Sequence, residues 1–216
     1  MVVRVWQQAS KAKSLLRVVV ATDDERIAAP VRAAGGTAIM TATTHQSGTD
    51  RIAEVAAHLH ADIYLNVQGD LPFIAPADLD ALAAPMRLDP SIAMATLATP
   101  IIDGHEWNNP NVVKVVCGAD GNALYFSRSP IPFARDGGMP AEALRHIGVY
   151  AYRRDFLLKF AGLRQGMLEK IEKLEQLRAL EHGYMIRVVT SVAPSIEVDT
   201  ADDLARARAE ATGSTR

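Results

Sequence analysis

The first third of the chain alternates apolar, β-branched runs with amphipathic segments, and this alternation constrains the fold more than any other feature. We expect strands at residues 17–21, 37–40 and 63–67, and helices at residues 22–34 and 50–60. This alternation predicts an α/β fold with a Rossmann-like, mostly parallel sheet flanked by helices. Ligands bind to such sheets beyond the carboxyl ends of the strands.

The middle of the chain has more strand patterns and turn residues than the first third and predicts a small β-rich insertion. Further strands are expected at 93–99, 112–116, 123–126, 145–152 and 187–190. Further helices are expected at 1–16, 156–160, 168–180 and 200–211. We therefore predict a single domain over residues 1–211 with a β-rich part at about 93–152, followed by a frayed tail at 212–216.

Composition excludes several classes of function. The formal net charge is −2, which gives no reason to expect a nucleic acid as partner. No run approaches the roughly 20 apolar residues that a membrane span needs, and residues 1–16 do not read as a signal peptide. Cys117 is the single cysteine, which excludes an internal disulfide and a cysteine-based zinc cluster and suits the reducing cytoplasm.

Two carboxylates are placed where strands end. Asp70 follows an apolar run and a Gly, and Asp199 lies where a short extended run meets the helix expected at 200–211. Mg²⁺ usually takes one or two protein carboxylates together with substrate phosphates, so the pair predicts a magnesium site. The alternative is that both are helix caps, because Asp commonly precedes a helix.

Seven short blocks in order carry a resemblance to a known family. They are residues 44–51 (THQSGTDR), 66–70 (NVQGD), 109–114 (NPNVVK), 125–128 (YFSR), 145–150 (RHIGVY), 174–178 (LEQLR) and 198–200 (VDT). Together they resemble the 3-deoxy-manno-octulosonate cytidylyltransferases, also called CMP-KDO synthetases, over nearly the whole chain. A dehydrogenase of the Rossmann type is disfavoured, because no G-x-G-x-x-G follows a first strand.

The resemblance implies a reaction and its partners. The anomeric hydroxyl of the sugar acid would attack the α-phosphate of CTP, pyrophosphate would leave, and the CMP-sugar would supply lipopolysaccharide assembly. Catalysis would rest on positioning and charge neutralisation. Members of the family are usually dimers, so we expect a homodimer with the β-rich part in the contact.

The resemblance also implies site residues. Asp70 and Asp199 match the family's catalytic, Mg²⁺-binding aspartates. The sugar-acid pocket is matched by Gln68, Arg128, His146, Tyr150 and Glu175. The segment beside the nucleotide is matched by Ser47, Gly48 and Arg51. Physically, Arg128 can grip the sugar carboxylate with a bidentate fork, and the polar side chains can bond to sugar hydroxyls.

Structural alternatives stay open for three of these residues. Glu175 and Arg178 could be an exposed helix pair at i, i+3. His146 could be a core histidine bonded to backbone, and Tyr150 could serve sheet packing.

The chain departs from the family pattern at its beginning. Members begin with a strand and a phosphate-binding loop, and residues 1–5 match the helix that follows that loop. We therefore expect a weakly active or inactive chain, since the loop supplies cations for the leaving pyrophosphate. A non-catalytic sugar-acid-binding module and a cytidylyltransferase for another acidic sugar are the alternatives. Leu71 also stands where relatives usually have an acid.

Overall fold

The computed structural model describes residues 1–193, 196–198 and 200–213, and these residues divide into two compact units. Unit 1 comprises Met1–His60, Asn66–Asp80 and Val192–Arg216. Unit 2 comprises Ala61–Leu65 and Ala81–Ser191. The division falls within strand β3 (Ile63–Asn66) and within helix α4 (Pro76–Leu88). This division into compact units does not test the single domain predicted over residues 1–211, which stays a prediction.

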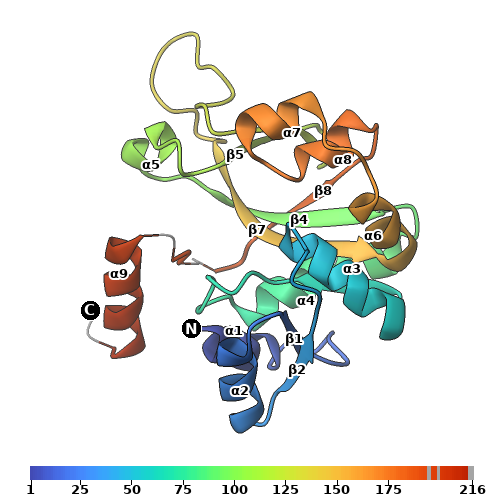
Figure 1. Ribbon diagram of the computed structural model, residues 1–216. Coiled ribbons are helices and arrows are strands. Elements are labelled where there is room, and N and C mark those ends of the chain that lie inside the picture. The colour runs from blue at the N-terminus through green and yellow to red at the C-terminus, as the bar shows by residue number, and fades with distance from the viewer. Residues whose placement is uncertain (194–195, 199, 214–216) are drawn as a thin grey trace. The chain divides into compact units, whose positions relative to one another are not determined.

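Unit 1 contains a parallel strand pair joined by a helix. Strands β1 (Val19–Thr22) and β2 (Thr37–Met40) pair in register from Val19↔Thr37 to Thr22↔Met40, and helix α2 (Glu25–Ala33) connects them. The side chain of Asp24 accepts a hydrogen bond from Arg26 N and so caps α2. This strand–helix–strand unit was predicted from the sequence and is confirmed (Figure 1).

Helix α1 (Val2–Ala9) packs against α2 and is shorter than the helix expected at 1–16. It ends early because the carboxylate of Asp80 accepts hydrogen bonds from the backbone N–H groups of Lys13 and Ser14, at 3.2 and 2.7 Å. These N–H groups are then unavailable to continue the helix.

The remaining helices of unit 1 begin with polar caps. Helix α3 (Gly48–His58) starts with a capping box formed by Ser47 and Asp50. Helix α9 (Ala201–Ala211) was expected at residues 200–211, and it starts with a second capping box formed by Thr200 and Asp203. Of the tail expected to fray, residues 214–216 lie outside the described residues.

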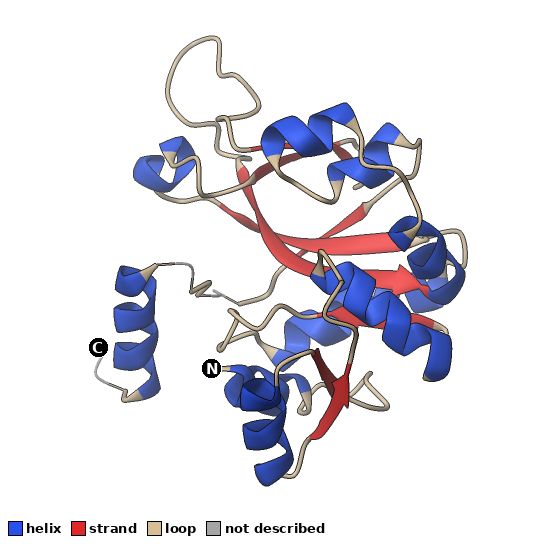
Figure 2. Cartoon of the chain, viewed as in Figure 1, coloured by secondary structure: helices blue, strands red, loops and turns tan. Residues whose placement is uncertain are grey.

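Unit 2 is built on a six-stranded sheet with the order β6-β5-β7-β4-β8, and β3 also pairs with β7 (Figure 2). Its strands are β4 (Met94–Pro100), β5 (Lys114–Cys117), β6 (Ala123–Ser127), β7 (Leu144–Arg153) and β8 (Arg187–Thr190). Strand β8 runs parallel to β4, whereas β7 is antiparallel to β4 and β5. The antiparallel pairs correspond to the β-rich part expected at about 93–152.

Four short helices complete unit 2. They are α5 (Gly104–Asn108), α6 (Arg154–Ala161), α7 (Met167–Glu172) and α8 (Leu177–Glu181). The single helix expected at 168–180 is wrong, because Lys173 adopts a left-handed conformation with φ 54° and separates α7 from α8. Helix α4 was not predicted, and Pro85 inside it explains why its pattern was missed.

Candidate active site

In unit 1, the start of α3 faces the polar turn that follows β3. A methyl group built on Gly48 would lie 3.6 Å from Gln68 Oε1 and 3.9 Å from Asn66 Nδ2. Gln68 Nε2 donates a hydrogen bond to Asn66 Oδ1 at 3.3 Å. Two of the predicted nucleotide-binding residues, Ser47 and Gly48, are thus brought to the predicted sugar-binding Gln68.

The Arg51 guanidinium forms hydrogen bonds and an ion pair within the protein. Its Nη1 donates to Thr41 Oγ1 at 2.9 Å and to the Ala42 carbonyl at 3.2 Å, and its Nη2 lies 2.9 Å from Asp23 Oδ2. The guanidinium therefore ties α3 to the segments that follow β1 and β2. Its predicted role beside the nucleotide stays a prediction, and the contacts favour a part in shaping this segment.

The neighbouring His45 is held by a carboxylate on α3. Glu54 Oε2 contacts His45 Nε2 and accepts a hydrogen bond from Ala42 N at 3.0 Å. The bond from Ala42, followed by that from His45, holds the pKa of the Glu54 carboxyl below its usual value. Side chains of α3 thus hold the chain that leads into the segment predicted to lie beside the nucleotide.

Asp70 lies in the turn after β3, as the sequence predicted. Its carbonyl accepts a hydrogen bond from Val198 N at 3.0 Å, so the residue directly before Asp199 lies against the Asp70 main chain. Asp199 itself lies outside the described residues. A carboxylate is the hard oxygen ligand that Mg²⁺ prefers, so the Asp70 side chain fits the ion. The described residues contain no group of three or more His, Cys, Asp or Glu able to hold a metal.

In unit 2, His146 is buried between β4 and aromatic rings. Its ring stands edge-on to Phe126 at 5.1 Å and lies 5.4 Å from Tyr150, with distances taken between ring centroids. Only 7% of His146 is exposed, and burial lowers the pKa of its imidazole to about 3. The side chain is therefore neutral throughout the range in which enzymes of this kind operate.

The hydrogen bonds around Thr96 fix the tautomer of His146. The Thr96 hydroxyl donates to the Val149 carbonyl at 2.8 Å, and the same oxygen lies 2.9 Å from His146 Nε2. A hydroxyl has one proton, so Thr96 must accept from an Nε2–H. The Nδ1 atom then carries a lone pair and can accept a hydrogen bond from a substrate hydroxyl. The sequence left open a core histidine bonded to the backbone. The structure shows a buried histidine whose Nε2 bonds to the Thr96 hydroxyl instead.

Replacing His146 by Gln is expected to flatten the dependence of stability on pH. The native state keeps His146 neutral, whereas the unfolded chain protonates it below about pH 6.5. The contribution of His146 to the free energy of unfolding is thus complete above about pH 6.5 and is lost as the pH falls towards 3. Between pH 6.5 and 4.5 the wild type should lose about 2 kcal/mol more than His146→Gln. Urea unfolding at both pH values measures this, and equal losses would refute the buried neutral state.

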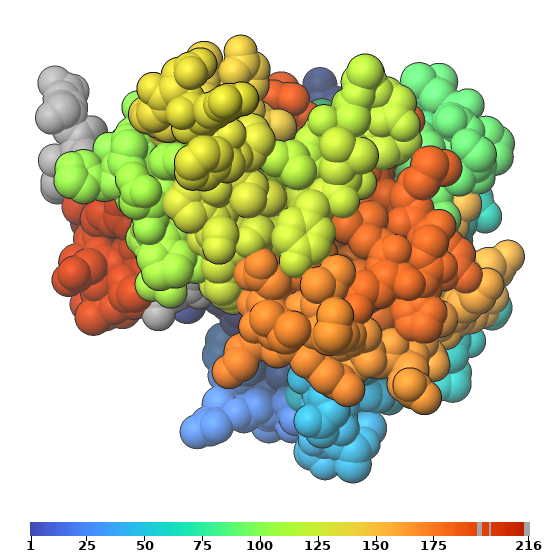
Figure 3. Space-filling view, turned by 90° about the horizontal axis from the view of Figure 1, so that it is seen from above, coloured from blue at the N-terminus to red at the C-terminus, as the bar shows by residue number. Residues whose placement is uncertain are grey.

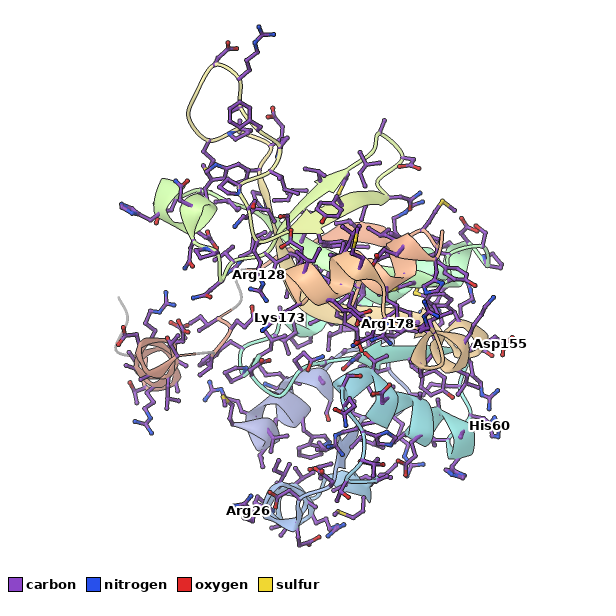
Figure 4. The ribbon with its side chains drawn as sticks, turned by 45° about the horizontal axis from the view of Figure 1, so that its top comes forward. Arg26, His60, Arg128, Asp155, Lys173 and Arg178 are labelled. Carbon is purple, nitrogen blue, oxygen red and sulfur yellow. The ribbon has the colours of Figure 1, made fainter. Side chains whose placement is uncertain are left out.

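Arg128 follows β6 and is anchored by Glu172 at the end of α7. Its backbone N donates to Glu172 Oε2 at 3.0 Å, its Nε donates to the Glu172 carbonyl at 2.9 Å, and its Nη1 donates to the Pro110 carbonyl at 3.2 Å. Figure 4 labels Arg128 near Lys173, the residue after Glu172. One N–H on Nη1 and two on Nη2 remain for a ligand, so an end-on bidentate grip on a carboxylate is compatible with these contacts.

Lys114 holds the main chain at Arg128 and was not singled out from the sequence. It is fully buried, and its ammonium donates to the carbonyls of Asn109, Val112 and Arg128 at 3.0, 2.6 and 2.6 Å. Burial, followed by the charge of Arg128, lowers the pKa of Lys114. Lys114 and Glu172 thus hold the Arg128 main chain through its carbonyl and its N–H.

Glu175 lies between α7 and α8, close to a buried arginine. Arg178 binds Glu169 through two bonds of 2.8 and 2.5 Å, and its Nη2 lies 3.6 Å from Glu175 Oε1. The Arg178 side chain is only 8% exposed, so the alternative of an exposed i, i+3 pair is wrong for this residue. The role of Glu175 in a sugar pocket stays a prediction.

The predicted site residues therefore fall into two groups, each within one unit. Unit 1 brings Ser47 and Gly48 to Gln68 and carries Asp70 in the same turn. In unit 2, His146 contacts Tyr150, while Arg128 and Glu175 flank the end of α7. The sequence missed the partners Thr96, Lys114 and Glu172, since the partner residues are distant in the chain.

One cavity of unit 2 lies away from these residues. Its volume is about 580 Å³, and residues of α5 and of the loop before β7 line it, including Asp103, Trp107 and Met139. The loop between β6 and β7 (yellow) and helices α7 and α8 (orange) lie on the face seen in Figure 3. None of the predicted site residues lines this cavity, so it does not define the candidate site.

Comparisons with known proteins agree on one family. A family model described as cytidylyltransferase matches residues 1–188. The 3-deoxy-manno-octulosonate cytidylyltransferase of Syntrophotalea carbinolica is 50% identical, with 99% of this chain and 88% of that protein covered. The corresponding protein of Geobacter metallireducens is 52% identical, with coverage of 94% and 84%.

Solved structures agree with these matches. A CMP:2-keto-3-deoxy-manno-octonic acid synthetase complexed with CTP superimposes with a TM-score of 0.93 at 44% identity, covering 99% of this chain and 88% of that one. A 4-diphosphocytidyl-2C-methyl-D-erythritol synthase from Anaerococcus prevotii matches at 15% identity with a TM-score of 0.62, which shows the fold alone. The predicted α/β fold is thereby confirmed.

These matches correct one expectation. The chain was expected to lack the family's first strand and phosphate loop and hence to be weakly active or inactive. The relatives match across 99% of the chain and do not support that expectation. Among the described residues, no helix combines the length and apolar character needed to cross a membrane.

Proposed function

Because the chain belongs to the 3-deoxy-manno-octulosonate cytidylyltransferase family, we propose that it transfers CMP from CTP to the anomeric hydroxyl of 3-deoxy-D-manno-octulosonate. The product would serve lipopolysaccharide biosynthesis. The observation that carries this proposal is the likeness, over almost the whole chain, to the synthetase solved with CTP. The alternative of a non-catalytic sugar-acid-binding module predicts binding of the sugar acid without binding of CTP.

The reaction balances as a simple displacement. The anomeric oxygen forms a bond to the α-phosphorus of CTP, the bond from that phosphorus to the bridging oxygen breaks, and pyrophosphate leaves with the electron pair. The hydroxyl proton passes to solvent or to a nearby acceptor. The chain's task is then to align the hydroxyl with the phosphate and to neutralise charge.

We assign the sugar acid to residues of unit 2. Arg128 offers an end-on pair of N–H groups to the carboxylate, in a position set by Lys114 and Glu172. His146 offers the Nδ1 lone pair to a sugar hydroxyl, because Thr96 accepts from its Nε2–H. The roles of Gln68, Tyr150 and Glu175 stay predictions from the family resemblance.

We assign the divalent ion to the turn after β3. Asp70 would hold Mg²⁺ together with Asp199, and the support is the hydrogen bond that joins Val198, the residue before Asp199, to the Asp70 carbonyl. When bound, the ion would neutralise charge on the phosphates of CTP. The homodimer and the cytoplasmic location expected from the sequence stay predictions.

A pyrophosphate-release assay tests the function. Purified protein with CTP, Mg²⁺ and 3-deoxy-D-manno-octulosonate should release pyrophosphate, and release should require both substrates. A panel with sialic acid and an amino analogue in place of the acceptor tests the alternative of another acidic sugar. If none of these acids gives pyrophosphate release, the proposal is refuted. If sialic acid alone gives release, sialic acid rather than 3-deoxy-D-manno-octulosonate is the acceptor.

A further inference from the structure

The amide of Asn66 is buried at the end of β3 and only one of its two polar atoms is bonded. The residue is 3% exposed, and its Oδ1 accepts a hydrogen bond from Gln68 Nε2. Its Nδ2 has no hydrogen-bond partner among the described residues. A buried amide donor without a partner is costly, so such an atom in a folded protein usually awaits a ligand or a water molecule.

The unbonded amide faces the start of α3. A methyl group on Gly48 would lie 3.9 Å from Asn66 Nδ2, and any longer side chain at this position would enter the same space. The first N–H groups of a helix have no acceptor within the helix, and its N-terminus carries partial positive charge. Helix α3 has 11 residues, so this end is well formed. The space beside Gly48 thus has the unbonded Asn66 Nδ2 as a donor next to the amide of Gln68, whose Oε1 and Nε2 would lie 3.6 and 3.7 Å from the same methyl group. An oxygen placed there can accept a hydrogen bond from Asn66 Nδ2.

The neighbouring contacts narrow the choice of ligand. Ser47 Oγ already accepts from Asp50 N, and Asp50 Oδ2 accepts from Ser47 N, so this capping box presents no cation to the space. Arg51 points its guanidinium to Asp23 and Thr41 instead. A phosphate would need such a cation, whereas an uncharged oxygen needs only the amide and the helix end.

We propose that Asn66 is a further substrate-binding residue, whose Nδ2 donates a hydrogen bond to an oxygen of the nucleoside part of CTP in the space opened by Gly48. This inference rests on the proposed function and adds to it a residue to which neither composition nor the family resemblance gave a role. Gln68 keeps the amide of Asn66 oriented, because its Nε2 occupies Oδ1 and leaves Nδ2 to face α3.

The variant Asn66→Asp separates this role from a structural one. Aspartate keeps the oxygen that accepts from Gln68 and the shape of the side chain, but it replaces the donor by a second acceptor. Calorimetry with CTP and Mg²⁺, without any sugar acid, should show about 30-fold weaker binding than wild type. The KM for the sugar acid at saturating CTP should stay within about twofold of wild type.

Two further variants keep the test decisive. Gly48→Leu should also weaken CTP binding by at least about tenfold. The leucine side chain fills the space, while the amide group of Asn66 itself stays unchanged. Asn122→Asp is the matched control, because Asn122 bonds to Asp120 and Arg187 in unit 2, and it should leave CTP affinity unchanged. Thermal unfolding of each variant reports whether it folds.

Several outcomes overturn the inference. If folded Asn66→Asp binds CTP as tightly as wild type while wild type turns CTP over, Asn66 has no contact with the nucleoside and the proposed function stands alone. If only the KM for the sugar acid changes, Asn66 acts through Gln68. If wild type itself binds no CTP, both the inference and the proposed function fail.

Discussion

Replacing Asp70 by Asn should lower kcat/KM for CTP by about 1,000-fold, which corresponds to ~4 kcal/mol of lost transition-state stabilisation. Asparagine keeps the size of the side chain and one oxygen, but it removes the negative charge that would hold the divalent ion. The Asp70 carbonyl, which accepts from Val198 N, is part of the main chain and is unaffected by the substitution. Initial rates of pyrophosphate release over a range of Mg²⁺ concentrations provide the measurement.

Asp80→Asn is the matched control for this substitution. Asp80 accepts hydrogen bonds from the backbone of Lys13 and Ser14. The Ser14 side chain, followed by these backbone bonds, lowers the pKa of its carboxyl. Its loss should reduce the melting temperature and leave kcat/KM within about threefold. A folded Asp70→Asn protein with wild-type activity would show that Asp70 serves only as a turn residue.

Replacing Arg128 by Lys should raise the KM for the sugar acid by about 100-fold, or ~3 kcal/mol, with a smaller effect on the KM for CTP. Lysine keeps the charge but cannot bond to the Glu172 and Pro110 carbonyls while also gripping a carboxylate with two parallel bonds. Steady-state kinetics with each substrate varied in turn separates the two KM values.

Arg187→Lys controls for the general effect of shortening a partly buried arginine. Arg187 donates from Nε to Asn122 Oδ1 in the same unit and has no predicted contact with substrate. Its KM values should match wild type. An unchanged KM for the sugar acid in Arg128→Lys would assign the Arg128 side chain to anchoring α7 rather than to the substrate.

Local patterns in the sequence predicted most of the elements. The strand–helix–strand order of β1, α2 and β2 followed from β-branched runs and from the helix start expected at residue 22, although Asp24 proves to be the cap. The break at Lys173 was missed because lysine rarely takes a positive φ, so no residue marks it as glycine would. Helix α4 was missed because Pro85 lies inside it, and proline usually marks the end of a helix.

The motifs identified the site residues, but their environments come from distant parts of the chain. The partner of His146 is Thr96, 50 residues earlier, and only the pairing of β4 with β7 brings them together. Glu172, at the end of helix α7, reaches Arg128 across 44 residues. Pairings of this range depend on sheet register, which a single sequence specifies only through its whole pattern of buried faces.

The buried charges of unit 2 show the same limit. Lys114 stands in an apolar strand pattern, where a buried ammonium is costly unless every proton finds an acceptor. Three carbonyls supply those acceptors, and one belongs to Arg128. The sequence gives no sign of this arrangement, because backbone carbonyls leave no mark in residue identity.

The central claim is that one divalent ion joins Asp70 and Asp199 to the phosphates of CTP. Anomalous diffraction from crystals grown with Mn²⁺ and CTP tests it directly. We expect a single strong peak within bonding distance of an oxygen of each carboxylate and of CTP. A metal bound elsewhere, or carboxylates of Asp70 and Asp199 too far apart to share one ion, would contradict it.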